Sequence, residues 1–284
     1  MSKRNLFLGT AAGKVGDVVV YRAGGTQRAR VRVVPKDPKT TTQMSQRSRI
    51  GGVVTTYRAG KGLLLDTFES KPSKQSAYNA YAQDTMPTAP YLTKEMNDLG
   101  CAIPMPMTIA RGSVPAPWSF ISKAENGLTA SILVPDDAQA TSIAQLSALL
   151  IAARPCCFKN GTQIIGVAVL YDAVNGQEEN FKKPFFTIGK ITLDTSDASQ
   201  LPAAETLTVT VAEGQVTLKV NGNDNEPYVY ALLVANKDAD GLHVTNAEGY
   251  MNGTAEDLYD EFMTEAAQAA AAESYGASGG SCVL

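Results

Sequence analysis

The sequence is poor in the residues that build catalytic and metal sites. It has one histidine, His243, and four cysteines, two of them adjacent, in 284 residues. Zinc sites need clustered histidine and cysteine ligands. A Ser-His-Asp arrangement would have to use His243, which lies in a strand-like pattern and is expected to face outward without a chemical role. We therefore expect no enzyme, no metal site, no cofactor and no disulfide framework.

Long apolar runs are also missing. The basic opening of the chain contains only the short apolar run Leu6-Phe7-Leu8, whereas a signal peptide needs about 7–15 apolar residues. No stretch approaches the roughly 20 apolar residues of a membrane span. The sequence predicts a protein that is made in a cytoplasm, carries no conventional export signal and has no membrane partner.

Acidic residues are almost absent from residues 1–62. This segment has 13 basic residues and only two acids, Asp17 and Asp37, for a net charge of +11. The rest of the chain has 12 basic and 26 acidic residues, for a net charge of −14. A total that is nearly neutral therefore hides a basic head and an acidic body.

Two strand-like runs lie early in the basic head. Residues 18–21 are β-branched and aromatic, and residues 27–34 alternate strictly, with Arg28, Arg30 and Arg32 on one face. Gly24-Gly25 between the runs is a turn signal. The pattern predicts a β-hairpin with a row of three guanidinium groups.

Helices are expected after the hairpin. Two prolines end the strand, and a threonine at 40–42 can cap a helix. Gly51-Gly52 and Gly60 each weaken that helix by about 1 kcal/mol relative to alanine, so we expect a kink or two pieces. A second helix follows Pro72, and the helical region ends near Gly100. The apolar stripe expected to be buried is Ile50, Val53, Val54, Tyr57, Leu64, Leu65 and Phe68.

The sequence of the acidic body predicts short strands separated by turns. Several Asn-Gly pairs between alternating runs are strong hairpin signals. Eight such strands favour an antiparallel β-sandwich of immunoglobulin-like architecture, with a helix or insert at 142–153. The expected strands are 118–121, 128–133, 163–171, 185–188, 207–211, 216–220, 228–235 and 242–245.

The end of the chain predicts an acidic helix. Thr254 and Asp257 resemble a capping box, and the alanine-rich run that follows carries six acids and no cation. Residues from Ser274 onward are small and polar, as in a flexible tail. The predicted fold class is therefore α+β. Its domains are a basic hairpin and helical head at 1–100, a Pro-rich linker at 101–117, a β-sandwich at 118–252, and an acidic helix with a tail at 253–284.

The cations of the head form the candidate binding site. Lysine and arginine neutralise phosphates and release counterions, which gives affinity that does not depend on base sequence. The same cations could instead meet acids of the body or of another copy, and both alternatives stay open. The candidate residues are Arg22, Arg28, Arg30, Arg32, Lys36, Lys39, Arg47, Arg49, Arg58 and Lys61.

One family resemblance rests on motifs in the head. The run from Gly13 to Arg22, Gly-Lys-Val-Gly-Asp-Val-Val-Val-Tyr-Arg, precedes Pro38-Lys39-Thr40, Gln43 and Gln46-Arg47. These residues resemble an uncharacterised protein family of gut bacteria and gut phages, whose pattern has Asn where Asp37 stands. The resemblance covers about the first 85 residues and implies a β-rich C-terminal half. It implies no known chemistry, and its phage context favours a virion component.

These observations give three functional hypotheses. The first is a non-enzymatic structural protein of a phage virion, whose head contacts DNA, RNA or acidic surfaces of itself or of other virion proteins. The second is a bacterial β-sandwich binding module with no role in a virion. The third is an enzyme built on the acidic body, which the missing motifs disfavour.

Overall fold

The computed structural model describes residues 13–23, 26–33, 37, 39–72, 75–124, 127–201, 206–223 and 225–277. The chain divides into two compact units, residues 1–39 and residues 40–284. The domain boundary expected near residue 100 lies inside the second unit. As the sequence predicts, the fold class is α+β, with a small antiparallel sheet at the N-terminus, helices, further antiparallel sheets and C-terminal helices.

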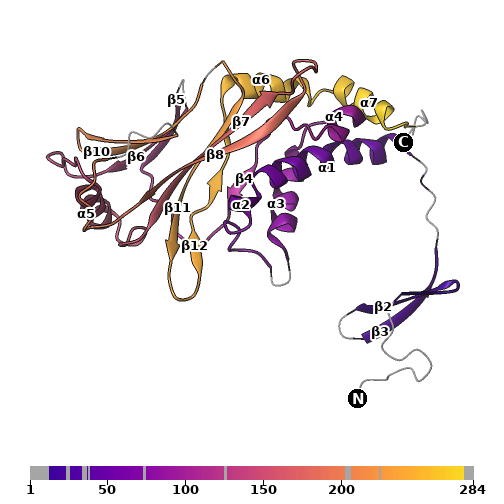
Figure 1. The fold of residues 1–284 in the computed structure, drawn as a ribbon, viewed down its shortest axis with the longest axis horizontal. Coiled ribbons are helices and arrows are strands. Elements are labelled where there is room, and N and C mark those ends of the chain that lie inside the picture. The colour runs from indigo at the N-terminus through magenta and orange to yellow at the C-terminus, as the bar shows by residue number, and fades with distance from the viewer. Residues whose placement is uncertain are drawn as a thin grey trace. The chain divides into compact units, whose positions relative to one another are not determined.

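The first unit is a three-stranded antiparallel sheet in the order β1-β2-β3. Its strands are β1 (Gly13–Val15), β2 (Val18–Ala23) and β3 (Thr26–Val31). The expected hairpin is confirmed, because β2 pairs with β3 from Val18 opposite Val31 to Ala23 opposite Thr26 (Figure 1). The alternation of residues 27–34 predicted it. The third strand, β1, was not expected.

The second unit contains two main antiparallel sheets. One has the order β5-β6-β10-β9, and the other has the order β12-β11-β7-β8 with β14 also paired to β11. All eight strands expected from the turn signals are present, with somewhat different bounds. They are β5 (Phe120–Ala124), β6 (Gly127–Leu133), β7 (Gln163–Ala173), β8 (Lys182–Thr192), β9 (Leu207–Ala212), β10 (Gln215–Asn221), β11 (Tyr228–Lys237) and β12 (Leu242–Val244); β14 is Tyr250–Met251.

The two sheets share one hydrophobic core. Strand β6 alternates buried and partly exposed residues, and its buried Ala130 lies opposite Leu218 of β10. These side chains pack in the same cluster as Ile164 of β7 and Leu232 of β11, which belong to the other sheet. The helix α5 (Ile143–Ala153), expected at 142–153, packs against this cluster through Leu146.

The central strand β11 is buried on both faces, in keeping with its nearly continuous apolar sequence. Tyr230 and Leu232 face the sheet-to-sheet core, and Ala231 and Leu233 face a second core. Helices supply the other side of that second core. They are α1 (Thr41–Ala59), α2 (Lys61–Leu64), α3 (Ala77–Thr85) and the 3-10 turn η1 (Met86–Thr88). The short helix α4 (Lys94–Asp98) places Met96 in a separate small cluster.

Aromatic side chains hold this helical layer together. The ring of Tyr57 lies 5.2 Å from that of Tyr78 and 5.5 Å from that of Tyr81, measured between centroids. The expected helical stripe is confirmed at Tyr57 and several neighbours but wrong at two positions, because Ile50 and Leu65 are 46% and 53% exposed. Leu65 lies just after the end of α2, so the periodicity of α1 does not determine which way it faces.

The expected two-piece helix is confirmed, because α1 ends at Gly60 and α2 begins at Lys61, whereas α1 itself is continuous through Gly51 and Gly52. Its N-cap is Thr40, whose side chain accepts a hydrogen bond from the Gln43 N–H, as expected. The two glycines provide space for neighbouring side chains. A Cβ at Gly52 would lie 2.7 Å from Leu92 Cδ1.

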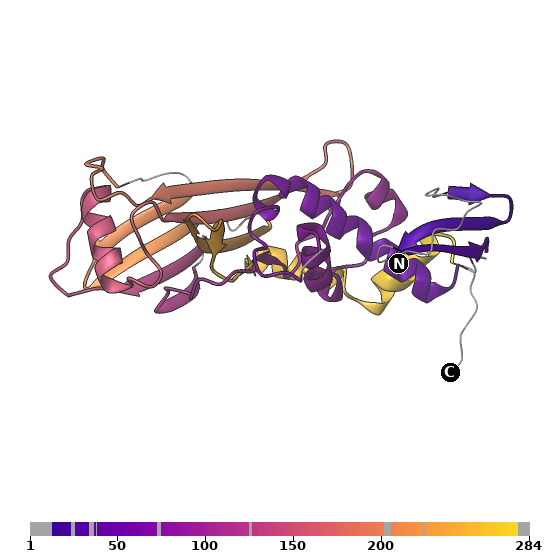
Figure 2. The ribbon, with the colours of Figure 1, turned by 90° about the horizontal axis from the view of Figure 1, so that it is seen from below.

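The end of the second unit also differs from expectation. The single acidic helix is two helices, α6 (Gly253–Glu261) and α7 (Glu265–Ser274), because Thr264 provides a second N-cap by accepting from the Ala267 N–H. The first is capped by Asn252 and not by Thr254. Figure 2 shows yellow α7 beside α1, where Gln268 Nε2 donates to Ser45 Oγ. Of the expected tail, residues 278–284 lie outside the described residues.

The Pro-rich stretch at 101–117 packs within the second unit. Cys101, Ile103, Met105 and Ile109 are all fully buried. The short strand β4 (Thr108–Ala110) pairs with β13 (Ala247–Glu248). This stretch therefore connects the helical layer to the sheets while contributing to their common core.

Candidate functional site

The N-terminal sheet carries its cations on one face. Tyr21 lies opposite Arg28, and Val19 lies opposite both Arg30 and Lys14. Residues directly opposite on neighbouring strands point to the same side of a sheet. Lys14, Arg28 and Arg30 therefore share a face with Tyr21, and the alternation of β3 continues toward Arg32. We call Lys14, Arg28, Arg30 and Arg32 the basic face.

The basic face is open to solvent. Its three arginines are exposed, and none of them forms an ion pair with a described residue. Arg30 stacks over the ring of Tyr21, with its guanidinium carbon 5.7 Å from the ring centroid. Asp17 in the β1–β2 turn is the one acid among the described residues of 13–33, and its carbonyl accepts from the Arg32 N–H. The charge on this face is thus not neutralised within the described sheet.

Three further predicted cations lie on the surface of the helical layer. Arg47 and Arg58 are exposed on α1, and Lys61 is exposed at the start of α2. Eleven residues are close to three helical turns, so Arg47 and Arg58 lie on the same side of α1, about 16 Å apart. Of the other predicted residues, Lys39 is exposed, Arg22 lies in β2 with only its backbone described, and Lys36 lies outside the described residues.

Arg49 differs from the other predicted cations because its guanidinium is already bonded. Its Nε donates to the Ala89 carbonyl at 2.7 Å, and a terminal nitrogen donates to the Pro87 carbonyl at 2.6 Å. It also lies over the ring of Tyr91, 5.3 Å from the centroid. Arg49 therefore attaches α1 to the segment around η1, and the binding proposal below does not include it.

Acids gather on the C-terminal helices. Asp257, Asp260, Glu265 and Glu273 of α6 and α7 are exposed and form no ion pair with a described residue. Glu256 differs, because it pairs with Lys123 of β5. The acidic character predicted for this segment is therefore available at the surface of the second unit.

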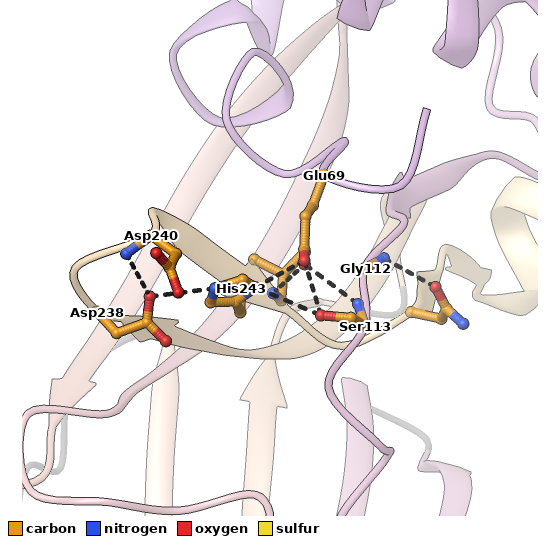
Figure 3. A network of polar contacts seen from close by, with 8 residues as sticks. Glu69, Gly112, Ser113, Asp238, Asp240 and His243 are labelled. Carbon is orange, nitrogen blue, oxygen red and sulfur yellow. Dashed lines mark hydrogen bonds and ion pairs between the residues drawn. The ribbon is translucent and has the colours of Figure 1, made fainter. Parts of the chain in front are cut away.

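A polar cluster surrounds the single histidine (Figure 3). His243 Nδ1 lies 2.7 Å from Glu69 Oε1, and Nε2 lies 3.1 Å from Asp238 Oδ1. Glu69 also accepts from the Ser113 hydroxyl at 2.7 Å and from the backbone N–H groups of Ser113 and Val244, both at 3.1 Å. The expectation of an outward spectator is wrong, because the β11–β12 hairpin and the segment after α2 place carboxylates on both sides of the ring.

The charged groups of this cluster favour one another's ionised forms. The hydrogen bond to Glu69 holds the pKa of His243 above its ordinary value, with Asp238 acting in the same direction. Burial works against ionisation of Glu69, but its bonds from Ser113, His243 and Val244 outweigh that effect and place its pKa below the usual value. A partly desolvated Asp238 likewise has a lowered pKa because the Asp240 N–H and His243 stabilise its charge.

This geometry does not suit nucleophilic catalysis. A general base needs an unprotonated ring nitrogen facing the nucleophile. Here both ring nitrogens face carboxylates, and the Ser113 hydroxyl donates to Glu69 while lying 3.4 Å from His243 Nδ1. The cluster therefore links its segments through an imidazole ring held between two carboxylates.

Sequence reasoning missed this cluster for a clear reason. Glu69 and His243 are 174 residues apart, and no local pattern links them. The contact with Asp238 was easier to predict from the sequence, because the turn at Asp238-x-Asp240-Gly241 brings residue 238 close to residue 243. No group of three or more potential metal ligands occurs in the part of the chain that the structure describes.

Among the described residues, the helices are all too short or too polar to cross a bilayer. Comparison with protein-family models, with curated proteins and with solved structures finds no match to this chain. The resemblance of its N-terminal motifs to a family of gut bacteria and gut phages therefore stays a prediction. The binding function is argued from the residues of this chain.

Proposed function

We propose that this chain is a non-enzymatic structural or assembly protein of a phage virion, and that its basic face binds nucleic acid. The observation that carries the proposal is a row of exposed arginines in a compact unit of its own, Arg28 and Arg30 on β3 and Arg32 just after it, none of which forms an ion pair with a described residue. Alternate residues of a strand repeat about every 7 Å, so Arg28, Arg30 and Arg32 present a linear array of cations. Such an array suits a phosphate backbone, and the flat ring of Tyr21 beside Arg30 could add base stacking.

We infer further that the two main sheets form an immunoglobulin-like sandwich. When the strands from β5 to β12 are lettered in chain order as A, B, C, C′, D, E, F and G, the sheets read A-B-E-D and G-F-C-C′. That is the strand order of immunoglobulin-like domains. The core shared by β6, β7, β10 and β11 supports the same inference. This domain would present protein contacts within the assembly.

A second candidate partner is an acidic protein surface. The exposed acids of α6 and α7 favour it, because they offer another copy of the chain a surface complementary to the basic face. Complementary charges speed and orient association. A role outside any virion, as a bacterial binding module, remains the alternative. Portal or capsid genes beside the gene for this chain would favour the virion.

Salt-dependent binding tests these alternatives. Anisotropy of a labelled DNA duplex with the full chain should show affinity that falls steeply between about 50 and 200 mM salt. Light scattering of the protein alone, at the same salt concentrations, reports self-association. Absence of DNA binding at the lower salt would refute the nucleic-acid proposal. A strict monomer there would refute the basic-to-acidic contact between copies.

A further inference from the structure

The His243 cluster joins segments that are far apart in the chain. Glu69 follows α2 in the helical layer, Ser113 follows β4, and Asp238 lies at the β11–β12 turn next to the strand that carries His243. Backbone bonds join the segment after α2 to the segment after β4, since the Ser70 N–H donates to the Arg111 carbonyl at 3.0 Å and the Arg111 N–H donates to the Thr67 carbonyl at 2.9 Å. The Val114 N–H in turn donates to the Val244 carbonyl of the hairpin at 3.0 Å. The side chains of Glu69 and His243 add a direct polar connection between the segment after α2 and this hairpin, beside the packing of Val244 in the core.

The number of bonds that His243 donates depends on its charge. An imidazolium has two N–H donors, whereas neutral imidazole has one. When charged, the ring donates to Glu69 and to Asp238 at once. When neutral, it must turn a lone pair toward one of the two carboxylates and lose that bond.

We propose that Glu69, Ser113, Asp238 and His243 form a pH-dependent clasp that holds the β11–β12 hairpin to the helical layer. The clasp is complete while His243 is charged, and loss of its proton releases one carboxylate. Release at Asp238 loosens the hairpin tip, and release at Glu69 loosens the segment after α2. Either way, the hollow lined by Leu65, Phe68, Glu69 and Leu242 becomes easier to open.

Other charged groups around the clasp do not reverse this dependence. Lys159 lies near Asp238 and favours its ionised form. Asp66, Lys71 and Lys237 line the hollow beside Glu69, and they contribute one acid and two cations. The charged groups in direct contact with the imidazole are both carboxylates, and both favour the charged form of the ring.

The direction of the pH effect follows from the raised pKa of His243. The stabilisation is fully present below about 6.5, the ordinary histidine value, and is lost as pH rises through the higher value in the folded chain. The pKa values of Glu69 and Asp238 are lowered, so their contribution is lost only as pH falls below about 4. The clasp is therefore strongest in mildly acidic solution.

The test uses NMR on the full chain, in which His243 is the one histidine. Its ring signals should titrate above about 6.5, and Asp238→Asn should move the midpoint downward. Amide exchange, corrected for the intrinsic rate, should show severalfold lower protection at 237–244 at about pH 8.5 than at about pH 6. His243→Gln should remove that dependence, whereas Asp98→Asn, which breaks the exposed pair with Lys94, should keep it.

Two results would overturn the clasp. One is a wild-type His243 that titrates at or below the ordinary value. The other is equal hairpin protection at both pH values in the wild-type chain. Both are measured without any variant, so a substitution that prevents folding does not protect the proposal from refutation.

Discussion

Replacing Gly51 by alanine should destabilise the chain, although alanine is the better helix former. The gain in helix propensity is about 1 kcal/mol. However, a Cβ at Gly51 would lie 1.9 Å from Asn97 Oδ1 and 2.3 Å from Asn97 Cγ. Asn97 cannot easily withdraw, because its Nδ2 donates to the Ser48 carbonyl and to the Tyr275 hydroxyl.

The magnitude follows from these opposing effects. Forcing extra atoms into a packed site costs about 1–3 kcal/mol, and each displaced hydrogen bond costs about 1 kcal/mol. We therefore expect Gly51→Ala to lower the free energy of unfolding by about 1–3 kcal/mol. For a unit of this size, each kcal/mol lowers Tm by about 2–4 °C.

Guanidinium unfolding followed by circular dichroism gives this free energy. The matched control is Gly62→Ala in α2, where a Cβ meets nothing within 4 Å; it should raise stability by up to about 1 kcal/mol. Asn97→Ala in the Gly51→Ala background should recover part of the loss, because it removes the clashing atoms. If Gly51→Ala is as stable as Gly62→Ala, the reasoning is refuted.

Further predictions concern other buried polar contacts and the sheet-to-sheet core. Arg49→Met should lower the free energy of unfolding by about 2 kcal/mol, because it removes charged hydrogen bonds to two carbonyls. The control Arg58→Met should change that free energy by less than about 0.5 kcal/mol. Equal losses in the two variants would contradict a structural role for Arg49. Arg111→Met should lower the free energy of unfolding by about 1–3 kcal/mol, because it leaves the largely buried Asp84 carboxylate without its ion pair. Adding Asp84→Asn to that variant should restore much of the lost stability. Leu218→Ala should cost about 2–5 kcal/mol in thermal unfolding, and an unchanged Tm would count against a core shared by the two sheets.

Local patterns in the sequence were enough to locate most strands. The alternation of residues 27–34 and the Asn-Gly turns of the body depend on short-range geometry, which is the same in any fold. The run at 228–235 predicted a strand, and the structure shows that it is buried. The α+β class followed from these elements together.

Packing over long distances was not predictable in the same way. Gly51 and Gly52 looked like helix breakers, yet α1 continues through them because Asn97 and Leu92 use the space beside the backbone. Arg49 looked like a surface cation until the structure placed two carbonyls against its guanidinium. In each case the partner is about 40 or more residues away, and no local pattern encodes it.

For the basic face, the arrangement of the arginines was predictable from the sequence, but their binding partner was not. Its arginines and their common side of the sheet were predictable, because a strand places every second residue on one face. Its partner is not encoded in the same local pattern, because phosphates and carboxylates attract the same guanidinium groups. Only binding measurements separate the two.

The most direct test of the central claim is the salt dependence of DNA binding by the wild-type chain and by Arg28→Gln/Arg30→Gln/Arg32→Gln. Each phosphate contact contributes about 0.9 to the slope of log affinity against log salt. Loss of three contacts should therefore reduce that slope by nearly three, while the thermal unfolding of the second unit stays unchanged. An unaltered slope and affinity in the variant would contradict binding through the basic face.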